Sequence, residues 1–230
     1  MFTFDLHVHT VKGSTDSGLL PSQLIQEASR IGLNGVNLSE HGGGWTNNKL
    51  KEEFGDTDLS ITTGLEVNTD MGHILAIGLD SYVSGIHELK TLRQVIDEVG
   101  GLLISAHPMR NFFNKPPYNS NLLFQKWSVI PETVEQAAEH ELFDLVDFIE
   151  VTNGSNSERE NQFTLAIANY LKIPGTGGSD CHSSQGIGRS CTVFHNPING
   201  IKSLISELKS HNFYPAQGLN TGKLTPFILV

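Results

Sequence analysis

The stretch Phe2-Thr3-Phe4-Asp5-Leu6-His7-Val8-His9-Thr10 decides how the rest of the sequence is interpreted. Its apolar residues predict a buried strand over residues 2–8. Side chains two residues apart on a strand point to the same face, so His7 and His9 can both address one point. The stretch therefore predicts a buried strand whose carboxyl end presents two imidazoles to the same place.

Beyond this stretch, short apolar runs alternate with amphipathic segments. Apolar runs predict strands over residues 2–8, 35–39, 60–67, 73–79, 102–106, 145–151 and 173–179. Amphipathic segments predict helices over residues 21–31, 86–99, 131–142 and 157–171. Strands that alternate with helices are typical of parallel βα units, which build either a doubly wound sheet or a βα barrel. The fold class is therefore α/β.

The length of 230 residues fits one domain of about 200 residues with an appendage. After residue 189 the alternation changes to a short strand at 191–194, a helix at 198–210 and a further short segment at 214–216. We expect a main domain over residues 1–189 and a C-terminal segment, residues 190–230, packed against it.

The charge balance is acidic, with 25 Asp and Glu against 15 Lys and Arg, for a formal net charge of −10. This balance disfavours duplex nucleic acid and anionic membranes as partners, because both require a basic surface.

Two Cys cannot build a disulfide framework, which fits a reducing compartment. No apolar run reaches the ~18 residues of a membrane helix, and no secretion signal is visible. We expect a cytoplasmic protein.

The ten His fall into two classes. Four are expected on surface helices or in a turn: His87, His140, His195 and His211. The other six lie in or directly after apolar strands, with carboxylates nearby: His7, His9, His41, His73, His107 and His182. The carboxyl ends of parallel strands gather on one rim of such a fold. Imidazoles and carboxylates that meet there suit zinc, manganese or iron, so a divalent metal site is predicted.

These motifs, taken in order, resemble the PHP family, named after polymerase and histidinol phosphatase. The matching segments are residues 5–10, Asp16 with residues 17–18, residues 39–41, 64–66, 72–73, 106–108 and 178–182. The resemblance runs from residue 4 to about 190, and residues 190–217 resemble the C-terminal segment of small stand-alone members. It implies a distorted seven-stranded (β/α)7 barrel and a metal-dependent phosphoesterase activity.

The resemblance also implies a cluster of two or three divalent ions. The implied ligands are His7, His9, Glu66 and Asp180 for the first ion, Glu66, His73 and His107 for the second, and Asp16, His41 and His182 for the third. A carboxylate can bridge two cations whereas an imidazole cannot, which makes Glu66 the natural bridge. Water shared by two such ions ionises near neutral pH, and the resulting hydroxide would attack phosphorus in line.

Residues outside the ligand set are candidates for other roles. Arg110 and Arg189 follow site segments and are predicted to contact phosphate, since Arg binds phosphate bidentately. Together with Glu66, Asp180 and His182 they form the predicted catalytic set. Glu150 ends a strand and is expected to support a ligand or the substrate. Two positions depart from the family: Glu40 replaces a more usual Asp, and Cys181 replaces a small residue and is expected to be buried filler.

The segment 111–130 is rich in aromatic residues but has no clear period. Phe112, Phe113, Tyr118 and Trp127 could cover the site and stack on a substrate, or they could form a satellite core or a subunit contact. Long loops inside compact domains are usually functional or mobile.

The leading hypothesis is hydrolysis of a phosphate ester of a small molecule or short nucleotide. A 5′→3′ exonuclease acting on short RNA or DNA is the main alternative in the same class. A catalytically silent metal-binding PHP domain is the alternative from another class. A hydrolase of the amidohydrolase type is a further one, although no Lys follows a strand end where such enzymes carry a carboxylated Lys.

Overall fold

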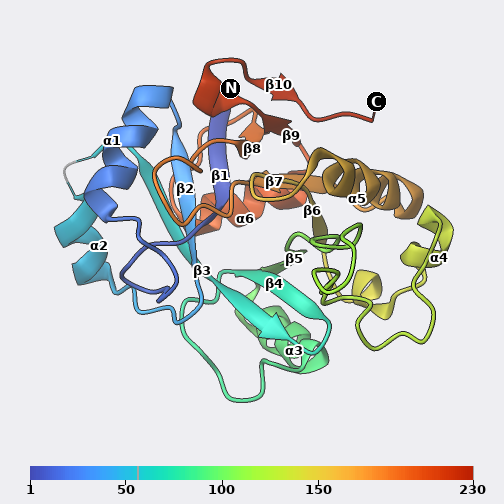
Figure 1. Cartoon of the computed structure of the whole chain (residues 1–230). Coiled ribbons are helices and arrows are strands. Elements are labelled where there is room, and N and C mark those ends of the chain that lie inside the picture. The colour runs from blue at the N-terminus through green and yellow to red at the C-terminus, as the bar shows by residue number, and fades with distance from the viewer. Residues whose placement is uncertain (56, 230) are drawn as a thin grey trace.

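The computed structural model describes residues 1–55 and 57–229. Within these residues ten strands form one curled sheet in the order β10-β9-β8-β1-β2-β3-β4-β5-β6-β7, with helices packed around it (Figure 1). The strands are β1 (Phe2–Val8), β2 (Gly35–Glu40), β3 (Ser60–Thr69), β4 (Gly72–Ile77), β5 (Leu102–Ser105), β6 (Phe148–Asn153), β7 (Gly175–Gly178), β8 (Ser190–Phe194), β9 (Phe213–Gln217) and β10 (Thr225–Pro226). The helices are α1 (Pro21–Ile31), α2 (Asn47–Phe54), α3 (Leu89–Val99), α4 (Val134–Ala138), α5 (Glu158–Leu171) and α6 (Ile201–Ser210), with 3-10 turns η1 (Glu141–Asp144) and η2 (Leu219–Thr221).

The α/β class is confirmed, but the expected seven-stranded (β/α)7 barrel is wrong in its strand number and in its regular alternation. Strands β1, β2 and β3 are parallel, whereas β4 runs antiparallel to both β3 and β5. Only Asp70 and Met71 separate β3 from β4. A connection this short can join only antiparallel strands, because a parallel pair needs a crossover of a dozen or more residues.

The sheet curls until the end of β1 meets the chain that follows β7. Val8 forms an isolated parallel bridge with Cys181. The backbone N–H of Asp180 donates to the His7 carbonyl at 2.8 Å, and that of His9 donates to the Cys181 carbonyl at 3.1 Å. These bonds fix the two imidazoles of β1 beside the segment that carries Asp180.

Asp5 reinforces this closure from inside the protein. Its buried carboxylate accepts hydrogen bonds from the backbone N–H groups of Ser179 at 2.8 Å and Gly188 at 3.4 Å. Burial raises the Asp5 pKa to about 6, and the hydrogen bonds to Ser179 oppose that rise. One side chain thus ties β1 to both ends of the segment between β7 and β8.

The C-terminal residues extend the same sheet. Strand β8 pairs antiparallel with β1, and β9 pairs antiparallel with β8. Leu204 and Leu208 of α6 pack with Phe4 and Phe194 in one buried cluster. Residues 190–217 therefore share both the sheet and the core of the residues that precede them.

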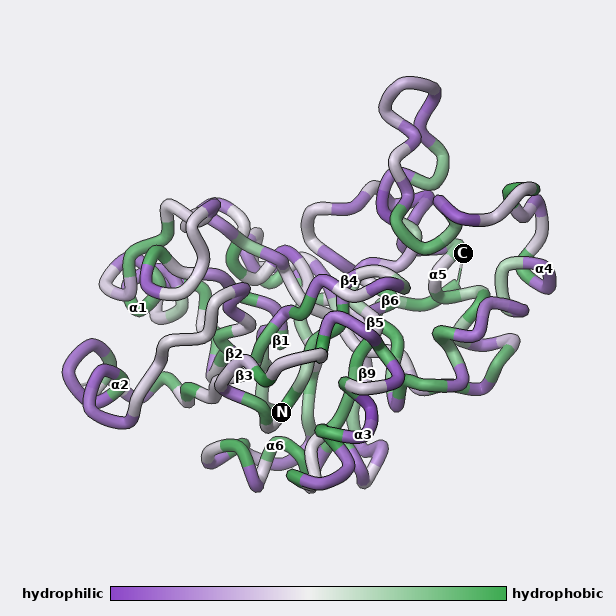
Figure 2. The backbone as a smooth tube through the Cα atoms, turned by 90° about the horizontal axis from the view of Figure 1, so that it is seen from below, coloured by the Kyte–Doolittle hydropathy of each residue, from purple (hydrophilic) through white to green (hydrophobic). Residues whose placement is uncertain are grey.

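Helix α2 was not predicted. It is mostly hydrophilic (Figure 2), and of its residues only Phe54 is buried. Thr46 begins the helix by accepting a hydrogen bond from the Lys49 N–H. No apolar stripe marked this segment, because the helix lies on the outside of the molecule. None of the helices formed by residues 1–55 and 57–229 is long and apolar enough to span a bilayer.

Most aromatic residues of segment 111–130 pack in or against the core cluster that also holds side chains of β3, β4, α3 and α5, and not in a separate satellite core. Phe112 stacks on Phe163 of α5, with ring centroids 5.4 Å apart, and Phe124 is fully buried. Trp127 stacks on His140 at 5.4 Å. His140 is buried and accepts a hydrogen bond from the Leu142 N–H, so its expected surface position is wrong. The physical reason is the indole of Trp127, a contact that the local sequence does not reveal.

Candidate metal centre

Side chains at or near the ends of β1 to β5 and of β7 converge at one end of the curled sheet. His7 and His9 come from the end of β1, His41 follows β2, Glu66 lies in β3 and His73 in β4. His107 follows β5, and Asp180 and His182 follow β7. Three overlapping groups among the described residues bring their ligand atoms within 4.8 Å of one another: His7, His9, Glu66 and Asp180; Glu66, His73 and His107; and His9, His41 and His182.

The first group is fully buried and has the dimensions of a metal site. The Nε2 atoms of His7 and His9 lie 3.3 and 3.2 Å from Glu66 Oε2, and 3.4 and 3.3 Å from Asp180 Oδ1. Such separations are those of neighbouring ligand atoms that each lie about 2.0–2.1 Å from a shared zinc-sized ion. Among the described residues neither Nε2 atom has a hydrogen-bond partner, although both are buried. Buried polar atoms are normally satisfied, so these two fit a cation held by the four side chains.

In His7 and His9, the hydrogen-bond partner of Nδ1 fixes the tautomer of the imidazole. His7 Nδ1 lies 3.0 Å from Glu150 Oε1, and a carboxylate can only accept, so Nδ1 carries the proton. His9 Nδ1 lies 3.1 Å from Ser14 Oγ. In both rings the lone pair is then left on Nε2, which faces the first group. Partners of this kind orient metal-binding imidazoles and raise their basicity.

Ser14 can accept from His9 because Glu40 takes its proton. The Ser14 hydroxyl donates to Glu40 Oε2 at 2.7 Å and also accepts from the His41 N–H at 3.1 Å. The buried Glu40 carboxylate accepts in addition from Thr10 and from the Trp45 indole N–H at 2.9 Å. Glu40 therefore anchors the segment that follows β1.

Glu66 faces two groups with different oxygen atoms. Its Oε2 lies against His7 and His9, whereas its Oε1 lies 2.8 Å from His73 Nδ1 and 3.0 Å from His107 Nε2. Burial alone raises the Glu66 pKa, but His7, His107 and His73 reverse that effect and hold it well below the usual range. The carboxylate is therefore charged, and each oxygen is available to a separate cation.

The third group is more open. Asp16 Oδ2 lies 3.3 Å from His41 Nε2 and 3.4 Å from His182 Nε2, and the Asp16 side chain is 55% exposed. The group contains His9 in place of the implied Asp16, which lies near His41 and His182 but is not a member of it. Because His9 Nε2 has one lone pair, it can serve only one ion at a time.

Two of the residues in these groups have backbones in the left-handed region, His107 with φ 32° and Asp180 with φ 52°. This conformation costs free energy for residues other than glycine, and backbone strain of this kind is common at functional sites. Gly178 is required for a different reason: a Cβ atom there would lie 2.5 Å from both Glu150 Oε1 and the His7 Cβ. Only glycine lets β7 approach the two side chains this closely.

The two predicted Arg lie differently. Arg110 Nη2 donates to Asp180 Oδ2 at 2.6 Å and to Asn153 Oδ1 at 2.8 Å, so Arg110 is part of the site. Arg189 is exposed, and its guanidinium forms no ion pair or hydrogen bond within the described part of the chain.

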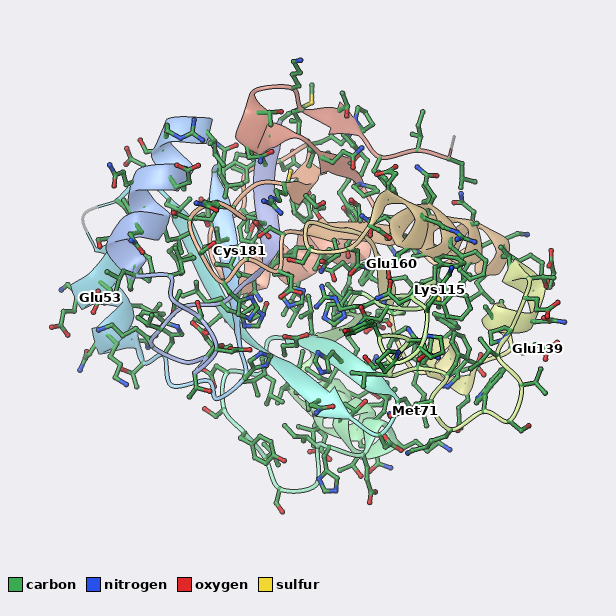
Figure 3. All side chains as sticks on the ribbon, in the orientation of Figure 1. Glu53, Met71, Lys115, Glu139, Glu160 and Cys181 are labelled. Atoms are coloured by element: carbon green, nitrogen blue, oxygen red, sulfur yellow. The ribbon has the colours of Figure 1, made fainter. Side chains whose placement is uncertain are left out.

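Cys181 is buried in the apolar cluster beside α1, and burial raises the pKa of its thiol. Figure 3 labels it on the segment between Asp180 and His182.

Sequence reasoning missed Ser14 and Asn153. Ser14 lies five residues after His9, and Asn153 holds both Arg110 and, through its Nδ2, Glu150 Oε2 at 2.9 Å. Neither residue type stands out in a sequence, because Ser and Asn are common in the turns that follow strands. Only their contacts across the fold reveal the role of each.

Metal binding should release protons. Burial lowers the pKa of His9, but the carboxylates of Asp180 and Glu66 beside its ring override this effect and raise the pKa to about 9. At pH 7 the metal-free imidazole is therefore protonated, and binding must displace that proton, so affinity falls as pH falls. We expect calorimetric titration with Mn²⁺ in two buffers of different ionisation enthalpy to report about one or more protons released per chain. Identical heats in both buffers would contradict this.

Ser14→Ala should weaken metal binding about 10–100-fold, the usual cost of losing a partner of a ligand. The substitution removes the acceptor that fixes His9 Nδ1, while the ligand itself stays in place. Competition with a chelator measures the dissociation constant. Ser81→Ala, whose hydroxyl bonds only exposed Asp80, is the matched control. Unchanged affinity in a folded Ser14→Ala protein would show that Ser14 does not support the site.

Comparison with known proteins gives a family-model match over part of the chain and a shared fold. A family model described as PHP-associated matches residues 158–213, from α5 to the start of β9. No curated protein matches the chain in sequence. PsfC from Pseudomonas syringae aligns over 89% of this chain and 88% of its own, with a TM-score of 0.60 and 18% identity.

Two further solved structures have the same fold. A candidate metal-dependent phosphoesterase from Bifidobacterium adolescentis aligns over 90% of this chain and 95% of its own, with a TM-score of 0.55 and 16% identity. An amidohydrolase from Chromobacterium violaceum, with bound sulfate and no metal, aligns over 78% of this chain and 87% of its own, also with a TM-score of 0.55 and 16% identity. The PHP-associated match covers residues 158–213, and the solved structures, all below 20% identity, share the fold of this chain.

Proposed function

We propose that this protein is a divalent-metal-dependent hydrolase of phosphate esters and acts on small phosphorylated molecules. One observation carries the proposal: the two oxygens of buried Glu66 face separate groups of imidazoles. A carboxylate shared in this way is suited to a pair of cations, and such pairs serve in-line displacement at phosphorus. Names of structural neighbours, which include a phosphoesterase and an amidohydrolase, agree with a metal-dependent hydrolase.

The side chains divide the work as follows. His7, His9, Asp180 and one oxygen of Glu66 would hold one ion, and His73, His107 and the other oxygen of Glu66 would hold the second. Bound ions of this kind lower the pKa of water and neutralise phosphate oxygens. Manganese, zinc and iron all suit this mixture of nitrogen and oxygen ligands. Asp16, His41 and His182 border the open side, where a third ion or the substrate would lie.

Arg110 supplies positive charge of the protein's own at this site. Its Nη2 and Nε are engaged by Asp180, Asn153 and Asn156, so the guanidinium is held in one orientation. Within the described residues its Nη1 has no partner, and the side chain is 30% exposed. We infer that Nη1 donates to a phosphate oxygen. Arg189 is proposed for the same role from its position alone.

The alternatives fit less well. A nuclease for single strands needs aromatic side chains on which bases stack. Phe124 is buried in the core with Phe112 and Trp127 packed against it, which leaves Tyr118 as the exposed aromatic residue of this predicted set. An amidohydrolase with a carboxylated Lys needs a Lys at the centre, and no Lys of the described chain forms an ion pair with any residue of the three groups. A catalytically silent metal-binding domain would use the same buried Nε2 atoms, so turnover of phosphate esters, and not metal content, separates it from the proposed enzyme.

Glu66→Gln and Asp180→Asn should each abolish hydrolysis, because each removes ligand charge while keeping side-chain shape. We expect phosphate release from a panel of phosphate monoesters, with Mn²⁺ supplied, to fall by more than the roughly 100-fold that loss of a mere supporting partner costs. His195→Ala, at an exposed position, is the control and should keep full activity. Circular dichroism checks folding. Full turnover by either folded variant would overturn the proposal, and cleavage of a labelled oligonucleotide in preference to the monoesters would favour the exonuclease.

A further inference from the structure

A pocket of about 200 Å³ lies directly beside the second group of ligands. Its wall includes His73, His107 and Arg110. Met71, labelled in Figure 3 at the turn between β3 and β4, forms another side of it. A phosphate held at the metal centre would therefore have its ester oxygen within reach of this pocket, and the organic group beyond that oxygen has to lie somewhere near.

Away from the metal centre, the wall of the pocket is uncharged. Its apolar side chains are Met71, Pro108, Leu122, Leu123 and Leu142. The Asn121 amide, which is also in the wall, is already used: it donates to the carbonyls of Pro108 and Arg110 at 2.8 and 2.9 Å. Asn111, which is half-buried, and Ser120, which is exposed, add polar side chains to the wall. A charged group beside the apolar side chains would lose its hydration without gaining an ion pair, which is costly, whereas an apolar group would lose nothing.

One polar atom in the wall lacks a partner. The Ser105 hydroxyl is buried, with the residue 1% exposed, and within the described residues it forms no hydrogen bond. Buried hydroxyls are normally satisfied. Ser105 lines the pocket two residues before His107, and we infer that a polar atom of the group that fills the pocket is the partner its hydroxyl lacks.

We propose that this pocket binds the alcohol part of the substrate and selects a compact, uncharged, ring-sized group with one hydrogen-bonding atom for Ser105. This inference rests on the proposed phosphoesterase function and narrows its substrate class. Pockets for drug-sized ligands usually measure about 300–1,000 Å³, so the present pocket suits a single ring better than a nucleotide chain. The segment 111–130 would then contribute specificity through Leu122 and Leu123, while its buried aromatic residues hold that wall in place.

Two kinds of measurement test this inference on the full-length, metal-loaded protein. In the first, kcat/KM is compared for phenyl phosphate, methyl phosphate and glycerol phosphate. Because phenol is also a better leaving group than methanol or glycerol, the pocket accounts only for that part of the phenyl phosphate preference, about 10-fold, that narrowing the pocket removes. In the second, calorimetry compares binding of phenylphosphonate with that of methylphosphonate, neither of which can be hydrolysed.

Leu122→Trp narrows the pocket at a position that is 38% exposed, so the fold should tolerate it. We expect it to reduce kcat/KM for phenyl phosphate about 10-fold, and to weaken phenylphosphonate binding, with little effect on the methyl compounds. Val83→Trp is the matched control, because Val83 is 39% exposed and lies outside this pocket. Ser105→Ala should weaken binding of a ring that carries a hydroxyl more than binding of the bare phenyl ring.

The results separate the two proposals. If no phosphate ester is hydrolysed but phenylphosphonate still binds more tightly than methylphosphonate, and Leu122→Trp removes the difference, the proposed activity fails and the pocket inference stands. The pocket inference is overturned by a different pair of results: kcat/KM for methyl phosphate or glycerol phosphate equals that for phenyl phosphate, and Leu122→Trp changes neither activity nor binding.

Discussion

The buried carboxylate of Glu66 is the interaction on which the rest of the centre depends. It lies within 3.5 Å of five imidazole rings, which come from the ends of β1, β2 and β5 and from β4 itself. Burying a charge is expensive unless it is paired, and here both Glu66 and Asp180 are buried with histidines around them. The curl of the sheet is what makes this possible, because it brings Asp180, on the segment after β7, back against β1.

A second layer of carboxylates supports the first. Glu150 contacts the Nδ1 atom of His7 directly, and Glu40 supports the Nδ1 atom of His9 through the Ser14 hydroxyl. Arg110 holds the Asp180 oxygen that the first group leaves free. His7, His9 and Asp180 are thus each oriented by a partner on a different strand or loop. The left-handed backbone of His107 and Asp180 is an added cost that this network of bonds sustains.

Much of this arrangement could be predicted from local sequence, and the remainder depends on long-range contacts. The two-residue spacing of His7 and His9 indicates a shared point, since strand geometry alone fixes it. By contrast, β8 and β9 extend the sheet beyond β1, and no local pattern records that pairing. The supporting role of Ser14 depends on Glu40, 26 residues away. Phe112 could cover the site or pack in the core, and only its contact with Phe163 decides between them.

The central claim is that one carboxylate serves two cations, and anomalous X-ray scattering tests it most directly. Crystals of the protein loaded with Mn²⁺ should give two anomalous peaks on either side of the Glu66 carboxylate. One peak should lie against His7 and His9, and the other against His73 and His107. A single peak, or peaks that do not contact Glu66, would contradict the account.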